Sequence, residues 1–197
     1  MDRRTLIGGS IAVFGLAACA QNAPAQTAAP APATPPDPEN TLILEIPGGR
    51  VVIQMLPDLA PQTVARIKTL ARQGFYDNTP FHRVIPGFMA QGGDPTGTGT
   101  GGSNLPNLPA EFSPASRARF VRGTVGMART ANPNSGNSQF FIMFAPNQGL
   151  DGQYTIWGRV ISGMDAVDKI KPGAPGSGTV TNPDRIRTAR IAADAPR

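Results

Sequence analysis

The chain has 197 residues and carries 18 Lys and Arg against 13 Asp and Glu, a formal net charge of +5. It contains one His and one Cys, too few for a His/Cys metal centre or for Cys–His nucleophilic catalysis, so no metal site is expected. No recognisable nucleic-acid-binding motif accompanies the mildly basic charge, and a nucleic-acid partner is therefore not expected either.

Residues 1–19 have the pattern of an export signal. Basic residues within positions 1–4 precede an apolar stretch at positions 5–18, which is shorter than the ~20 residues of a membrane-spanning helix. The motif Leu16-Ala17-Ala18-Cys19 then places small residues before the single cysteine. This arrangement resembles a bacterial lipoprotein signal, which implies lipidation at Cys19. We expect a lipoprotein of the cell envelope, anchored to the membrane and facing the periplasm; Sec and twin-arginine export both remain open.

Residues 20–40 consist almost wholly of Ala, Pro, Gln, Thr and Asn, with prolines at positions 24, 30, 32, 35, 36 and 38. Such a composition cannot bury a core and favours an extended, disordered linker. We expect a tether here, followed by a folded domain over residues 41–197. The roughly 150 residues of that domain are enough for a single hydrophobic core, and we expect a monomer.

The folded domain begins with a hairpin signal, because residues 41–46 and 50–55 are rich in β-forming side chains and flank Pro47-Gly48-Gly49. A helix follows, with Pro61 suited to its first turn, apolar residues at helical spacing, and Gly74 suited to its end. Further short strands are expected around residues 81–84, 88–91, 124–128, 139–144, 155–160 and 186–191, with a second short helix near 164–170. This succession predicts a mainly β fold, a closed antiparallel barrel.

The glycine-rich run Gly97-Thr98-Gly99-Thr100-Gly101-Gly102 has the G-x-G-x-x-G spacing of a dinucleotide-binding turn. That motif normally opens a helix, whereas the prolines at positions 106 and 109 disfavour a helix here. The run is interpreted as a flexible loop, and no cofactor is expected. A nicotinamide-dependent oxidoreductase is the corresponding alternative, which nicotinamide binding would reveal.

Residues 81–94 mix polar and apolar side chains in an unusual way. Arg83 and Gln91 lie among Phe, Val, Ile and Met, and residues 138–142 (Ser-Gln-Phe-Phe-Ile) repeat the mixture downstream. The lone His82 is interpreted as a hydrogen-bonded packing residue. Arg is almost never fully buried without a partner, so Arg83 predicts a guanidinium at the edge of an apolar pocket.

Together with the glycine-rich stretch between them, these two runs resemble the cyclophilin family of peptidyl-prolyl isomerases, and the resemblance covers roughly residues 41–191. It implies an eight-stranded barrel capped by two helices, with a cofactor-free active site on its outer face. The implied catalytic residues are Arg83 and its polar neighbour Gln91. The implied substrate-binding residues are Phe88, Met89, Phe141 and Leu150 in the proline pocket, Gln139 at its edge, Ala128 and Thr130 beside the peptide groove, Gly99 in the adjacent loop, and Tyr154 closing the pocket.

The chemistry implied by this resemblance makes and breaks no bond. Rotation about an X-Pro amide crosses a barrier of ~18–20 kcal/mol that arises from resonance between the nitrogen lone pair and the carbonyl. A fixed hydrogen-bond donor aimed at the prolyl nitrogen lowers this barrier, and Arg83 is the candidate donor. An apolar socket holds the proline ring while an amide such as Gln91 holds the rotating carbonyl.

Four positions depart from the family pattern. Met127-Ala128-Arg129-Thr130 replaces the commoner Met-Ala-Asn-Ala, Tyr154 stands where many members have His, and Gly149 stands where a bulky aromatic is usual. The sequence still predicts a peptidyl-prolyl cis-trans isomerase that assists the folding of exported proteins and acts on unfolded or flexible proline-containing chains. The alternative is a non-catalytic proline-peptide-binding module; the intact donor, Arg83, favours the enzyme.

Overall fold

The structure, a computed structural model, describes residues 37–194. The expected export signal with Cys19, and the expected tether up to residue 36, lie outside the described residues. None of the helices within 37–194 is long and apolar enough to cross a membrane.

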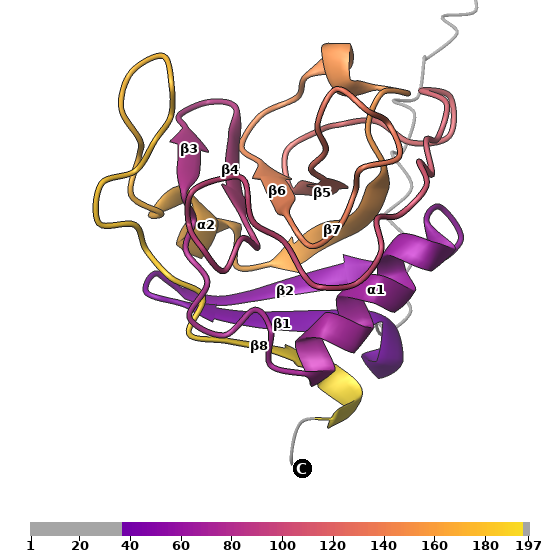
Figure 1. Ribbon diagram of the computed structural model, residues 1–197, viewed down its shortest axis with the longest axis horizontal. Helices are drawn as coiled ribbons and strands as arrows, with labels where there is room; N and C mark the ends of the chain where they lie inside the picture. The colour runs from indigo at the N-terminus through magenta and orange to yellow at the C-terminus, as the bar shows by residue number, and fades with distance from the viewer. Residues whose placement is uncertain (1–36, 195–197) are drawn as a thin grey trace, which may run out of the picture. The chain divides into compact units, whose positions relative to one another are not determined.

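Eight antiparallel strands and two α-helices make up the described fold (Figure 1). The strands are β1 (Thr41–Ile46), β2 (Gly49–Met55), β3 (Arg83–Ile85), β4 (Met89–Gly92), β5 (Thr124–Met127), β6 (Phe140–Met143), β7 (Ile156–Ser162) and β8 (Thr188–Ile191). The helices are α1 (Pro61–Arg72) and α2 (Met164–Asp168), and the chain also forms three 3-10 turns, η1 (Pro38–Asn40), η2 (Gln148–Leu150) and η3 (Ala192–Asp194). One curled sheet contains all the strands in the order β3-β4-β6-β5-β7-β2-β1-β8. The predicted mainly β class with two helices is confirmed.

The two edge strands, β3 and β8, do not pair with each other as a ladder. Instead, residues 173–186 run beside β3 and the segment before it. The amide of Val84 donates to Gly178 O at 2.7 Å, and isolated bridges join Arg83 to Thr179 and Pro80 to Arg185. Irregular backbone therefore spans the gap between the sheet edges, and β8 is shorter than the strand expected from residue 186.

The β1–β2 hairpin follows the sequence prediction closely. Its register pairs Ile46 with Gly49 across a tight turn, and alternate residues of both strands are buried. A Cβ at Gly48 would lie 2.6 Å from the Ala166 carbonyl oxygen of α2, so the turn needs glycine in order to pack against that helix. The hairpin thereby fixes the position of α2 on the sheet.

The first long helix, α1, begins at Pro61, as expected. Its free amide groups at Gln62 and Thr63 donate to the carboxylate of Glu111 at 2.9 and 2.8 Å, which caps the helix from a distant loop. The apolar stripe that includes Ile67 faces the core, and Gly74, at φ +68°, ends the helix. The helix packs against β8.

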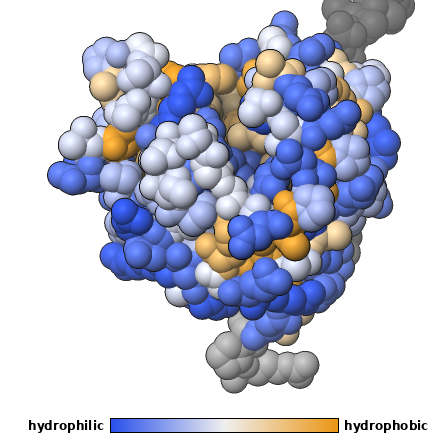
Figure 2. Space-filling model, in the orientation of Figure 1, coloured by the Kyte–Doolittle hydropathy of each residue, from blue (hydrophilic) through white to orange (hydrophobic). Residues whose placement is uncertain are grey.

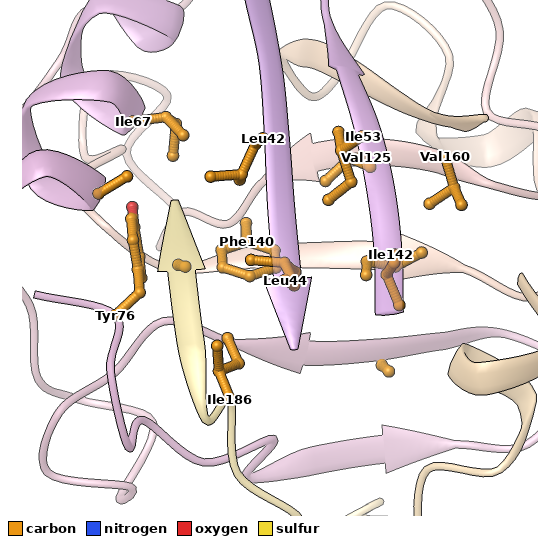
Figure 3. Packing of buried hydrophobic residues seen from close by; sticks show 14 of the residues in the cluster. Leu42, Leu44, Ile53, Ile67, Tyr76, Val125, Phe140, Ile142, Val160 and Ile186 are labelled. Atoms are coloured by element: carbon orange, nitrogen blue, oxygen red, sulfur yellow. The ribbon is translucent and has the colours of Figure 1, made fainter. Parts of the chain in front are cut away.

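The hydrophobic core lies between α1 and the curled sheet (Figure 3). Its largest members, Trp157 and Tyr76, are fully buried, and Phe140 meets each of them edge-on with ring centroids 5.9 and 5.7 Å apart. The hydroxyl of Tyr76 donates to Ser138 O at 3.1 Å, and burial raises its pKa. The face seen in Figure 2 is mostly hydrophilic, with hydrophobic side chains in limited patches.

Residues 37–40, which the sequence analysis assigned to the tether, belong to the folded unit. The side chain of Asp37 accepts the amide of Glu39 and so caps η1. Arg72 of α1 then joins Glu39 at 2.9 Å and Asp194 of η3 at 2.8 Å. One guanidinium thus fastens the first and last turns of the described chain to the same helix.

Candidate functional site

A pocket of about 230 Å³ opens on the sheet where β3, β4 and β6 adjoin the loops after β5 and η2. Its lining consists of Arg83, Phe88, Met89, Gln91, Ala128, Arg129, Phe141, Leu150 and Tyr154. Eight of these nine residues were singled out from the sequence, although they come from segments as far apart as residues 83 and 154. We call this space the first pocket.

The apolar wall of the first pocket belongs to a second hydrophobic cluster, distinct from the main core. Phe141 stacks on Phe120 with ring centroids 5.6 Å apart and meets Tyr154 edge-on at 5.7 Å. Gly126 lies opposite Phe141 in the β5–β6 ladder, and a Cβ there would come within 2.5 Å of the Phe141 ring. The absence of a side chain at Gly126 therefore allows the ring to take its place in the wall.

A chain of polar side chains forms the other edge of the first pocket. Arg83 and Gln91 face each other across the β3–β4 ladder, and the Arg83 guanidinium donates to Gln91 Oε1 at 3.4 Å and to Ser177 O at 3.2 Å. Gln91 Nε2 in turn donates to Gln139 Oε1 at 2.9 Å. Arg83 forms no ion pair within the described residues, so its charge remains available at the pocket edge.

A second pocket of about 460 Å³ adjoins the first, and the two share Gln91, Ala128 and Arg129. Gly99, Thr130 and Gln139, the three remaining site residues expected from the sequence, line this second pocket. The structure therefore gathers all eleven predicted catalytic and substrate-binding residues around two adjoining pockets. It leaves their individual roles as predictions.

The glycine-rich loop that borders the second pocket is held by Asp94, whose side chain is fully buried. The carboxylate accepts hydrogen bonds from Thr96 N and Oγ1, both at 2.8 Å, from Gly99 N at 2.7 Å and from Gly101 N at 3.1 Å. Burial by itself raises the pKa of Asp94, but these hydrogen bonds outweigh it, and the net pKa is lowered. The loop expected to be flexible is thus organised around one carboxylate.

The same loop holds the polar chain of the first pocket, because Gln139 Nε2 donates to Gly99 O at 3.0 Å and to Gly101 O at 2.8 Å. His82 lies beneath the loop and is 6% exposed, which confirms its packing role. The expected hydrogen bond is absent, since neither ring nitrogen has a partner within residues 37–194. Burial lowers the pKa of His82, which favours the neutral form of the ring.

Arg129 is the site residue that the sequence analysis did not assign. Its guanidinium lies 4.4 Å from the centre of the Tyr154 ring and 5.6 Å from that of Phe112. An arginine in a polar loop ordinarily indicates only a solvated charge. The signal that could have found it is its position between two predicted groove residues, Ala128 and Thr130.

No group of three or more His, Cys, Asp and Glu side chains within residues 37–194 is placed to hold a metal ion. The polar side chains that line the two pockets are instead the guanidinium groups of Arg83 and Arg129, four side-chain amides, four Ser and Thr hydroxyls and the hydroxyl of Tyr154. Such a set can donate hydrogen bonds to a peptide and, beside the apolar wall, hold an apolar ring, but the lining includes no His, Cys, Lys, Asp or Glu that could activate a nucleophile.

Comparison with known proteins agrees with this fold. Residues 41–191 match the family model of the cyclophilin type peptidyl-prolyl cis-trans isomerases. A probable peptidyl-prolyl cis-trans isomerase of Brucella suis is 58% identical over 170 residues, covering 80% of this chain and 85% of that protein. Peptidyl-prolyl cis-trans isomerase-like 1 of Bos taurus is 40% identical over 141 residues, covering 70% of this chain and 84% of that protein.

Solved structures give the same result. The cyclophilin AquaCyp293 of Hirschia baltica is 30% identical, with a TM-score of 0.71, over 81% of this chain and 76% of that one. A cyclophilin type isomerase of Cryptosporidium parvum, crystallised in the presence of the dipeptide Ala-Pro, is also 30% identical, with a TM-score of 0.70, over 77% of this chain and 98% of that one. Fold and sequence thus define a prolyl isomerase domain. The chain belongs to the cyclophilin family and is a cyclophilin-type peptidyl-prolyl cis-trans isomerase.

Proposed function

We propose that Arg83 is the catalytic hydrogen-bond donor and that the first pocket holds the substrate proline. The observation that carries this proposal is the position of the Arg83 guanidinium at the edge of an apolar pocket, with no ion-pair partner among residues 37–194. Phe88, Met89, Phe141 and Leu150 grip the ring, and Tyr154 closes the pocket. The guanidinium donates to the prolyl nitrogen and draws its lone pair out of conjugation with the carbonyl, which lowers the resonance barrier.

Gln91 has a supporting role in this mechanism. Its side-chain oxygen accepts from Arg83 and its amide donates to Gln139, so the side chain is held on both sides. In this position it holds the Arg83 fork at the pocket edge and contacts the rotating carbonyl. Gln139, Gly99, Ala128 and Thr130 line the path by which the peptide continues into the second pocket.

The substrates proposed for this site are unfolded or flexible polypeptides that contain proline. The related Cryptosporidium isomerase crystallised with Ala-Pro supports this class. The export signal of residues 1–19 places the enzyme, in this proposal, in the cell envelope, where Cys19 carries a lipid and the domain faces the periplasm as a monomer. Its role there is to assist the folding of exported proteins.

The donor role is tested with Arg83→Ala and Arg83→Lys in an NMR exchange assay on an Ala-Pro peptide. A charge-assisted hydrogen bond worth ~1.5–3 kcal/mol in the transition state predicts a loss of roughly 10- to 150-fold in kcat/KM for Arg83→Ala. Arg83→Lys keeps the charge without the planar fork, so an intermediate loss is expected. The exposed Arg159, which lines neither pocket, supplies the control Arg159→Ala.

Peptide affinity, measured by titrating the same variants with the Ala-Pro peptide, separates an effect on catalysis from an effect on binding. Arg83→Ala is expected to bind the peptide with an affinity close to that of the parent, because the apolar wall is unchanged. Equal turnover of Arg83→Ala and the parent would remove Arg83 from the mechanism. Peptide binding by the parent without accelerated exchange would favour the non-catalytic binding module.

A further inference from the structure

Arg129 lies where the two pockets meet, since it is one of the three residues that line both. In the proposed function the proline occupies the first pocket and the chain continues through the second. An extended chain advances about 3.3 Å per residue, so residues one or two positions from the proline pass close to Arg129. The side chain at this position is thus placed to read the residues that flank the proline.

The guanidinium of Arg129 is held in one geometry. Its Nε and Nη2 donate to Gln153 O at 3.1 and 2.9 Å, and its Nη1 donates to Thr130 O at 2.9 Å. The ring of Tyr154 lies against it at 4.4 Å. A fixed side chain loses little conformational entropy when a ligand binds, which makes it a better recognition element than a free surface lysine.

The positive charge of Arg129 is not neutralised within the described residues. All its hydrogen-bond acceptors are backbone carbonyls, and it takes part in no ion pair there. Glu111, the acidic residue nearest to Phe112 in sequence, is engaged with the amide groups at the start of α1. The site therefore presents a half-buried cation to whatever occupies the junction of the pockets.

We propose that Arg129 is a specificity-determining residue that favours substrates with Asp or Glu one or two positions from the proline, on the side of the peptide that enters the second pocket. This inference rests on the proposed function. A carboxylate at that distance gains attraction from the fixed guanidinium, whereas a lysine is repelled. Partly exposed charge pairs of this kind are worth modest energies, so the expected preference for Glu over Lys is roughly three- to tenfold in kcat/KM.

The test uses two sets of peptides of equal length around an Ala-Pro core. One set carries Glu, Gln or Lys two positions before the proline, and the other carries the same residues two positions after it. Exchange is measured by NMR at low ionic strength, which avoids the sequence preference of a coupling protease. The proteins are the parent, Arg129→Gln, Arg129→Lys and a charge-matched control, Arg187→Gln, whose exposed side chain lines neither pocket.

The parent is expected to prefer Glu over Lys in one of the two sets, and Arg129→Gln is expected to abolish most of this preference. Arg129→Lys should retain part of the Glu preference. Salt at 0.5 M should weaken the preference, because the Debye screening length falls to a few ångströms at about 0.5–1 M. Arg187→Gln should leave the Glu-to-Lys ratio unchanged, although it alters net charge by the same amount. The neutral Gln peptide reports any effect of Arg129→Gln on the pocket itself.

Equal rates for Glu and Lys peptides in the parent would overturn the inference. An undiminished preference for Glu in Arg129→Gln would also overturn the inference, because the overall charge of the protein would then explain the preference. If Arg129→Gln does not fold, two other results overturn the inference. One is loss of the Glu-over-Lys preference in Arg187→Gln, and the other is a Glu-over-Lys preference of the parent that high salt does not weaken. Failure of the parent to isomerise any peptide would refute the proposed function itself, a distinguishable result.

Discussion

Replacement of Asp94 by Asn tests whether one buried carboxylate organises the glycine-rich loop. The Asn side chain can keep an oxygen toward Thr96, but its NH₂ group then faces the amide groups of Gly99 and Gly101, which are donors as well. Two hydrogen bonds to a charged acceptor are lost, each worth ~1.5–3 kcal/mol. Because a neutral amide is less costly to bury than a carboxylate, the net loss in unfolding free energy should be about 3–5 kcal/mol.

Such a loss is a large part of the 5–15 kcal/mol that is typical of a folded domain, so the variant is studied at low temperature. Unfolding by urea, followed by the fluorescence of the buried Trp157, gives the free energies of the variant and the parent. The control is Asp58→Asn, at an exposed position whose side chain makes no hydrogen bond to any described residue, with an expected change within about 0.5 kcal/mol. A difference below about 1 kcal/mol between Asp94→Asn and the parent at neutral pH would refute the reasoning.

The pH dependence of the same difference provides a second check. The folded-state pKa of Asp94 lies below its unfolded value of about 3.9, so its contribution to stability is fully present above that pH. The contribution is lost as pH falls through the lower, folded pKa. The stability gap between the parent and Asp94→Asn should thus stay constant near neutrality and narrow below about pH 4. Prolyl isomerisation by the folded variant should also decrease, because Gln139 donates to the carbonyls of this loop.

Two further predictions concern the pocket wall and the export signal. A Cβ at Gly126→Ala would approach the Phe141 ring to 2.5 Å, so this substitution should displace the ring and destabilise the domain by about 1–3 kcal/mol. Peptide affinity measured by titration should also weaken, and an affinity equal to that of the parent would contradict the proposed proline pocket. Cys19→Ser should yield an active enzyme that fractionates with soluble exported protein whereas the parent fractionates with membranes, and a soluble exported parent would contradict the lipoprotein assignment.

The parts of the fold that depend on local sequence were predictable. The β1–β2 hairpin and α1 are each determined by a few neighbouring residues, such as Pro61 and Gly74, and both form at nearly the expected bounds. The irregular segment 173–186 that spans the sheet edges was not predicted. Its place depends on backbone hydrogen bonds to residues about 90 positions earlier, such as that between Val84 and Gly178, and no local pattern encodes them.

The candidate site shows the same division. Six of the predicted site residues lie within two sequence motifs, the resemblance to the family implied the other five, and the structure gathers all eleven at two pockets. The residues that hold these side chains in place were not predicted. Arg83 donates to the carbonyl of Ser177, which is distant in the sequence, and the rings of Phe112 and Tyr154 around Arg129 come from two different loops. Such partners are fixed by tertiary packing, which a single sequence shows only where a motif happens to include them.

The ion pairs of Arg72 with Glu39 and Asp194 have a mechanical consequence. The chain enters the folded unit at η1 and leaves it at η3, and these turns contact each other beside the same helix (Figure 1). If a force were applied to the chain before η1, it would act first on η1, β1 and α1. The strands that carry the pockets, β3, β4 and β6, lie at the other end of the sheet order. A force applied to the segment before η1 is therefore expected to strain these ion pairs before it deforms the two pockets.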